Sequence, residues 1–90
     1  MYKKLTKKTL SILKSWHRQG YAWLTKDKMH SRVFLHIKKP TKLSQSWYSY
    51  NSMMWVRKSD ETKEIIDLCS WDVPVEIAKV LKENGVEVEK

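Results

Sequence analysis

The spacing of apolar residues changes from helical to alternating near Gly20, and this change sets what the chain can fold into. Residues 3 to 19 carry apolar side chains at helical spacing, and residues 31 to 38 alternate between apolar and polar side chains. Glycine is the residue type that most often ends a helix in the left-handed conformation. The pattern therefore predicts an N-terminal amphipathic helix over residues 3–19, followed by antiparallel strands, in an α+β domain.

One side of the expected helix is basic. On a helical wheel Lys7, Lys14 and Arg18 lie within about 60° of Lys3, and the apolar residues lie on the opposite side. No acidic residue occurs in this segment, so the cations lack the i, i+4 partners that an ordinary solvated face carries. The apolar side is too modest for stable attachment to lipid. The basic side is therefore either an ordinary solvated face or a surface for phosphates, and the missing acids favour phosphates over both solvent alone and a membrane.

Charge is divided unevenly along the chain. The first 45 residues hold twelve Lys and Arg and one acid, Asp27, whereas the second 45 hold six Lys and Arg and nine acids. A half-chain with one acid builds a positive field that attracts phosphate-rich partners. Five Trp, four Tyr and one Phe offer faces on which unstacked bases can stack. Nucleic acid, and RNA in particular, is therefore the expected partner.

Length and composition indicate one small globular domain over residues 1–90. The single cysteine, Cys69, excludes an internal disulfide. The first residues, Met-Tyr-Lys-Lys, lack the apolar stretch of a signal peptide, and no apolar run is long enough to cross a bilayer. We expect a soluble protein of the cytoplasm.

Residues 21–25 and 31–38 are expected to form two antiparallel strands. Val33, Leu35 and Ile37 share one face of the second strand and should point into the core. The opposite face combines cations, an imidazole and one aromatic ring. It suits either an ordinary exposed sheet face or a surface for phosphates and bases. Its residues are Arg32, Phe34, His36 and Lys38.

Residues 44–58 are expected to form a hairpin that turns at Asn51-Ser52 and places Tyr48 opposite Trp55. Both faces of this hairpin are too apolar for a sheet with one wet side. Either helices cover both faces, or one aromatic set is a platform for bases or for a protein partner. One face would hold Tyr48, Tyr50, Met53, Trp55 and Arg57, and the other Trp47, Met54 and Val56.

Residues 60–70 fit either a helix capped by Ser59 or a strand, and the residues that follow favour the strand. A C-terminal helix should come next, with Asp72 as its N-cap, Pro74 in its first turn and Gly85 at its end. The core side of this helix would carry Val73, Ile77, Val80 and Leu81. The fold would then be a helix, an antiparallel meander of four or five strands, and a closing helix.

The sequence has neither a metal-ligand spacing nor a glycine-rich phosphate loop, so we expect no metal and no nucleotide cofactor. One catalytic chemistry stays open, because a metal-independent ribonuclease needs only an acid, a base and cations around the scissile phosphate. The residues that could supply these groups are Lys28, His30, Arg32 and His36.

The segment from Leu10 to Pro40 resembles the HicA family of mRNA-cleaving toxins in its order of helix, glycine turn, strand, short loop with His30, and strand. The resemblance implies a compact fold like that of double-stranded-RNA-binding domains, and a catalytic role for His30. In that family the catalytic histidine follows a Gly-Ser pair, whereas Lys28-Met29 precedes His30 here. We therefore expect that this chain has no catalytic residue.

The whole chain resembles the small early proteins of T-even-type phages, since it is short, basic, rich in Trp and poor in Gly, and begins Met-Tyr-Lys-Lys. Those proteins commonly inactivate host defence factors. The TifA-like inhibitors among them block an RNA-cutting toxin, with RNA involved in the complex. This resemblance implies an antitoxin-like inhibitor of a host ribonuclease toxin or RNA-processing factor, acting in the host cytoplasm.

Together these features predict a non-catalytic RNA-binding protein that also engages a protein partner. A ribonuclease of the HicA type and a purely protein-binding inhibitor are the alternatives. Glu76, Glu83 and Glu87 would meet the protein partner, or a second copy of the chain in an RNA-dependent oligomer. The expected RNA-binding residues are Lys3, Lys7, Lys14, Arg18, Arg32, Phe34, His36, Lys38, Tyr48, Trp55 and Arg57.

Overall fold

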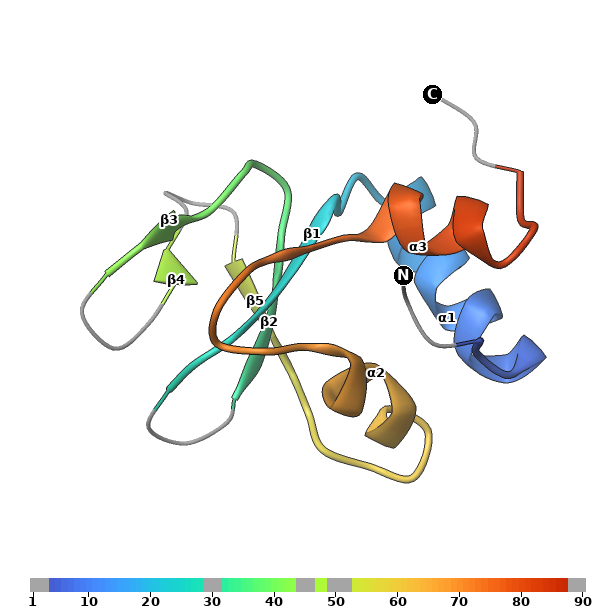
Figure 1. Ribbon diagram of the computed structural model, residues 1–90, viewed down its shortest axis with the longest axis horizontal. Helices are drawn as coiled ribbons and strands as arrows, with labels where there is room; N and C mark the ends of the chain where they lie inside the picture. The colour runs from blue at the N-terminus through green and yellow to red at the C-terminus, as the bar shows by residue number, and fades with distance from the viewer. Residues whose placement is uncertain (1–3, 29–31, 44–46, 49–52, 88–90) are drawn as a thin grey trace.

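The computed structural model describes residues 4–28, 32–43, 47–48 and 53–87, and its principal axes measure 35 × 27 × 23 Å (Figure 1). In chain order the elements are α1 (Lys7–Arg18), β1 (Trp23–Lys26), β2 (Val33–His36), β3 (Thr41–Lys42), β4 (Trp47–Tyr48), β5 (Met53–Val56), α2 (Lys63–Leu68), β6 (Val75–Glu76) and α3 (Ile77–Glu83). The expected α+β layout of an N-terminal helix, antiparallel strands and a C-terminal helix is confirmed.

The main sheet has four strands in the order β5-β2-β1-β6, and all its neighbours are antiparallel. Leu24 lies opposite Leu35, and Thr25 lies opposite Phe34. Because successive strand residues point to opposite faces, Leu24 and Leu35 share one face and Phe34 lies on the other. β3 and β4 pair separately, at the opposite end of the long axis from α1 and α3 (Figure 1).

The apolar core lies between the helices and one face of the sheet. Leu24 and Leu35 are fully buried there, together with Leu13 of α1 and Ile77 of α3. Burial of each such side chain contributes about 1.5–3 kcal/mol of transfer free energy. The helices therefore cover the face that carries Leu24 and Leu35 and leave the Phe34 face on the other side of the sheet.

Helix α1 begins at Lys7, later than the expected range 3–19. Its N-cap is Thr6, whose Oγ1 accepts a hydrogen bond from the Thr9 N–H at 3.3 Å. Before the cap the chain is tied elsewhere, because the Leu5 N–H donates to the Asn84 side chain at 2.9 Å. The end of the helix is as expected, since Gly20 adopts a φ of 101° just beyond Arg18.

The expected hairpin over residues 44–58 was wrong. Strand β4 pairs with β3, with Tyr48 opposite Thr41, and β5 pairs with β2, with Trp55 opposite Phe34. The expected turn at Asn51-Ser52 lies outside the described residues. Pairing β5 with β2 extends the core face of the sheet, which a local β4–β5 hairpin would not do.

The expected division of these strands into two faces was confirmed in part. Trp47 and Val56 are buried, and Tyr48 and Trp55 are 45% and 54% exposed. Met54, which was expected on the face of Trp47 and Val56, is exposed. The exposed aromatic residues are therefore the ones that the alternation assigned to a common face, although they lie in different sheets.

The preference for a strand over residues 60–70 was also wrong, because residues 63–68 form helix α2. Ile65 and Ile66 are both buried. Adjacent residues of a strand point to opposite faces, whereas a helix lets neighbours reach one core together. Ser59 is not the cap of this helix, which follows Thr62; the Ser59 N–H donates to Thr62 Oγ1 at 2.9 Å.

Helix α3 begins at Ile77, so the expected N-cap at Asp72 was wrong. The residues before Ile77 pair with β1 as strand β6, and the Ile77 N–H donates to the Ala22 carbonyl at 2.9 Å. The backbone groups of these residues are thus bonded to the sheet, and they cannot form the first turn of a helix that starts near Asp72. Val73 consequently lies outside the core and is 59% exposed. The core residues of α3 are Ile77, Val80 and Leu81, as expected.

Two expectations for strand β2 were wrong. Ile37 was expected in the core and is 47% exposed, because β2 ends at His36. His36 was expected on an exposed face and is fully buried, with Nε2 2.7 Å from Thr25 Oγ1. Burial disfavours the imidazolium and lowers the pKa of His36 to about 4. The fold therefore buries a neutral imidazole on the Phe34 face of the sheet.

This buried imidazole predicts a fold that weakens in mild acid. The unfolded chain takes up a proton at the ordinary pKa of 6.5, whereas the folded chain does so only near pH 4, so the unfolded state binds more protons in between. The contribution of His36 should be fully present above pH 6.5 and fall by up to about 3 kcal/mol as the pH drops toward 4. Urea unfolding across this range measures the loss.

The matched variant is His36→Gln, which retains an amide for Thr25 but cannot take up a proton. The carboxylates titrate in both proteins, so the difference between the two pH profiles isolates His36. We expect the free energy of unfolding of the variant to vary less with pH between 6.5 and 4. Parallel profiles for the two proteins would contradict the assignment.

Candidate nucleic-acid interface

Trp55 lies on β5, the outer strand of the main sheet, and more than half of its surface is exposed. The guanidinium carbons of Arg32 and Arg57 both lie 5.9 Å from the centroid of its ring. These distances fall within the cation–π range. An exposed aromatic ring with two guanidinium groups over it is therefore presented on one face of the sheet. With Phe34 these three residues are termed the Trp55 cluster.

The strand register explains why these residues meet. Phe34 on β2 lies directly opposite Trp55 on β5, and both point away from the face that carries Leu24 and Leu35. One step beyond the end of the ladder, the same register places Arg32 opposite Arg57 on the face of Trp55. The cluster therefore depends on the pairing of two strands that are separated in the sequence.

The electrostatics of the Trp55 cluster favour an anionic ligand. Two like charges opposite each other on a strand pair repel. In the part of the chain that the structure describes, neither Arg32 nor Arg57 forms a salt bridge with a carboxylate. The negative face of the Trp55 ring offsets part of the repulsion. A ligand that combines flat rings with negative charge would offset more of it.

Two lysines lie over the rings of three further tryptophans. The Lys39 Nζ lies 5.8 Å from the ring of Trp23, which shares the face of Phe34. The Lys42 Nζ lies 4.6 Å from the Trp71 ring and 5.6 Å from the Trp47 ring. Trp47 is buried and its Nε1–H donates to the Trp71 carbonyl at 3.0 Å. The Lys42 contacts therefore stabilise the fold around β3 and β4.

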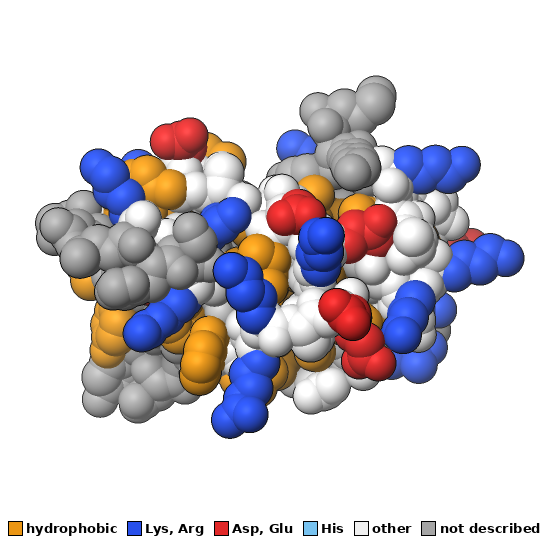
Figure 2. Space-filling view, turned by 90° about the horizontal axis from the view of Figure 1, so that it is seen from below, with side chains coloured by type: hydrophobic (Ala, Val, Ile, Leu, Met, Phe, Trp, Pro, Cys, Tyr) orange, Lys and Arg blue, Asp and Glu red, His pale blue; other side chains and the backbone are white. Residues whose placement is uncertain are grey.

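Acidic side chains are unevenly distributed over the face shown in Figure 2. Hydrophobic and basic side chains lie side by side over the half of the molecule that holds β3 and β4. Most of the acidic side chains seen in this view gather over the helical half, where α2 lies. The acids of that region are Asp60, Glu61, Glu64 and Asp67.

The structure brings four of the expected RNA-binding residues together in the Trp55 cluster and separates the others. Lys38 is exposed beyond the end of β2, and Tyr48 is exposed on β4. His36 is buried and cannot contact RNA from that position, so its assignment to the RNA surface was wrong. Lys3 lies outside the described residues.

The remaining expected residues, Lys7, Lys14 and Arg18, are exposed on α1. Helix α1 packs against the Leu24 and Leu35 face of the sheet, whereas Trp55 points from the other face. The residues expected to bind RNA are therefore divided between two surfaces on opposite sides of the sheet.

The sequence interpretation missed the contacts of Lys39 and Lys42 with Trp23, Trp47 and Trp71. The residue types gave a signal, because lysine and tryptophan commonly form cation–π pairs. The partners, however, are distant along the chain, as Lys42 and Trp71 show. Composition alone does not indicate which lysine lies over which ring.

Of the two histidines considered for catalysis, the described residues include His36 alone. His30 lies outside them, and His36 is buried. Burial raises the pKa of Cys69 to about 12, and its Sγ–H donates to the Ile65 carbonyl at 3.3 Å. The described ranges also contain no group of three metal-ligating side chains that could hold an ion.

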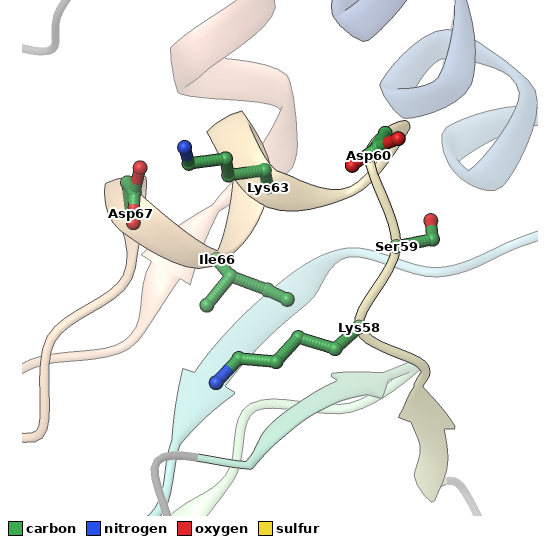
Figure 3. Close-up of a pocket in the computed structure, with 6 residues that line it drawn as sticks. All are labelled: Lys58, Ser59, Asp60, Lys63, Ile66 and Asp67. Atoms are coloured by element: carbon green, nitrogen blue, oxygen red, sulfur yellow. The ribbon is translucent and has the colours of Figure 1, made fainter.

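A groove of about 500 Å³ lies beneath α2 (Figure 3). Ile66 points into it from the helix, and the Lys58 side chain runs along it below Ile66. The hydroxyl of Ser59, at one side of the groove, is hydrogen bonded to Thr62 Oγ1 at 3.2 Å. A serine nucleophile needs a base beside its hydroxyl, whereas the Ser59 hydroxyl is paired with another hydroxyl.

No helix within the described ranges is both long and apolar enough to cross a membrane. The chain matches no protein-family model, and neither the curated proteins nor the solved structures include a significant match to it.

Proposed function

We propose that the protein binds single-stranded RNA without cleaving it, with the Trp55 cluster as the central contact. The observation that carries this proposal is the exposed Trp55 ring with the guanidinium groups of Arg32 and Arg57 over it. Stacking of an unpaired base on an aromatic side chain contributes about 1–3 kcal/mol. The two arginines can bind the phosphates that flank such a base.

The chemistry of arginine supports this proposal. A guanidinium is planar and always charged, and it binds phosphate oxygens through two parallel hydrogen bonds while its face lies on an aromatic ring. Arg32 and Arg57 can therefore stay over Trp55 and still direct N–H groups outward to an anion. Base faces are available in single strands and are enclosed in a duplex, so the cluster suits a single strand.

Engagement of a protein partner and inhibition of a ribonuclease toxin stay predictions from the sequence. Binding of RNA at the Trp55 cluster does not depend on either of them. A partner protein with an acidic surface would also be attracted to two arginines, and the tests below distinguish it from RNA.

The first test removes the stacking surface. Trp55→Ala should weaken binding of a short unstructured RNA by about 5- to 150-fold, which corresponds to the loss of about 1–3 kcal/mol. Trp55→Phe should retain most of the affinity, because the aromatic face is kept. Fluorescence anisotropy with a labelled oligouridine of about twelve nucleotides measures both variants.

Val73→Ala is the matched control, since Val73 is an equally exposed apolar residue outside the cluster. The melting temperatures of all three variants should stay near that of the wild type. Wild-type affinity in Trp55→Ala would show that this ring does not stack a base. If the wild type binds no RNA at low salt, an acidic protein becomes the better candidate partner.

The second test addresses the phosphate contacts. The double variant Arg32→Gln/Arg57→Gln should lower the slope of log affinity against log salt by about 1.4, because each phosphate contact to a single strand contributes about 0.7. The control is Lys79→Gln/Lys82→Gln, which removes the same charge from the exposed side of α3. Equal slopes for the two double variants would show that the positive charge acts only at long range.

The third test concerns catalysis. A long RNA incubated with the purified protein should stay intact over time, because no described residues form an acid–base pair at the Trp55 cluster. Gel analysis of the RNA measures this directly. Cleavage that is lost in a folded His30→Ala variant would favour a ribonuclease instead.

A further inference from the structure

We infer that the exposed basic side of α1 is a second RNA-binding surface, which takes the phosphate backbone of double-helical RNA. One molecule would then join a duplex segment on α1 to a single strand at the Trp55 cluster. The bridging step rests on the proposed function, whereas duplex binding by α1 does not. The α1 surface is made of Lys7, Lys14 and Arg18.

The position of α1 separates this surface from the Trp55 cluster. Leu13 fixes the inner side of α1 in the core, next to the Leu24 and Leu35 face of the sheet. The α1 surface points away from that core, and Trp55 points from the opposite face of the sheet. The two cationic surfaces therefore face away from each other and meet different segments of an RNA.

The composition of the α1 surface fits a phosphate backbone. Its three cations lie within about 40° on the helical wheel, and they form a line with steps of about 10 Å and about 6 Å along the axis. Among the described residues, no carboxylate forms a salt bridge with any of them. Trp16, the aromatic residue of α1, is half-buried and packs against the core.

This surface therefore presents charge without a stacking platform. Double-helical RNA is complementary to such a surface, because its phosphates and sugars lie outside and its base faces are enclosed. Single-stranded RNA would gain less from α1, since its bases would find no ring there. The two surfaces thus differ in the form of RNA that each one fits.

The cations at the start of α1 destabilise the helix. Lys7 and Lys8 occupy the first turn, where the positive end of the helix dipole makes each cation unfavourable by about 0.3–1 kcal/mol. Helix α2 and the turn before it offset part of this cost. The Glu64 Oε1 accepts from the Thr6 N–H at 3.1 Å, and Glu61 lies 3.5 Å from the Lys8 Nζ.

Glu64 of α2 thus meets the N-cap and Glu61, in the turn before α2, meets Lys8. These contacts leave the α1 surface positive. A polyanionic ligand explains a line of cations that the helix itself does not need. The phosphates of a duplex would provide the counter-charge along the whole line.

A two-RNA capture assay tests the inference. A duplex of about 16 base pairs is fixed to beads, the protein is added, and recruitment of a fluorescent oligouridine is measured; the affinity of each RNA is also measured alone. Lys7→Gln/Lys14→Gln/Arg18→Gln should reduce duplex affinity about tenfold or more and lower its salt slope by about 3. Its affinity for the single strand should change much less. Trp55→Ala should retain its affinity for the duplex and fail to recruit the oligouridine.

Lys79→Gln/Lys82→Gln serves again as the control for charge. If the triple variant does not fold by circular dichroism, Lys14→Gln, at the middle of the α1 surface, gives the same readout with a slope change of about 1. Wild-type duplex affinity in the α1 variant overturns the inference and leaves the proposed function intact. Equal losses of affinity for the duplex and for the single strand also overturn it, because they would indicate one continuous surface. If the α1 variant loses affinity for the single strand alone, the inference is also overturned, because α1 would then belong to the proposed site.

Discussion

The antiparallel pairing of β1 with β2 is the interaction on which the rest of the structure depends. It places Leu24 against Leu35 for the helices to cover, and it places Thr25 against Phe34 on the other face. Because the period of a strand is two residues, a slip by one position would exchange the two faces completely. The core and the Trp55 cluster would both be lost, since each needs its own set of alternate residues.

A buried polar contact helps to fix this register. Thr25 and His36 are both inaccessible to solvent, and the 2.7 Å contact between them lies on the sheet face that also carries Phe34. A slipped register would separate the two groups, and each buried group left without a partner costs about 1–3 kcal/mol. An apolar pair at these positions would stabilise the slipped and the correct pairings more equally. The polar pair therefore contributes specificity as well as stability.

The sequence predicts the parts of this fold that depend on local patterns. The alternation around Val33 and Leu35 and the glycine stop of α1 were sufficient for the helix and the first two strands. The partner of β5 was mistaken, because a strand pattern does not say which edge the strand joins. Strand β6 has two residues, too few for any periodicity to show. The pattern named Arg32, Trp55 and Arg57 one by one, but only the β2–β5 register brings them together.

The turn between α1 and β1 fixes the direction of the helix relative to the strand. The Gly20 N–H donates to the His17 carbonyl and the Tyr21 N–H to the Trp16 carbonyl, both at 3.1 Å, and the Ala22 N–H already joins the sheet through the His36 carbonyl. No flexible linker therefore separates the helix from the strand. Because Leu13 also holds α1 in the core, the helix has a fixed position relative to the strand. Two RNA segments bound to the two sides of the molecule would be set at an angle that the protein dictates, so its effect on RNA would be on shape as much as on occupancy.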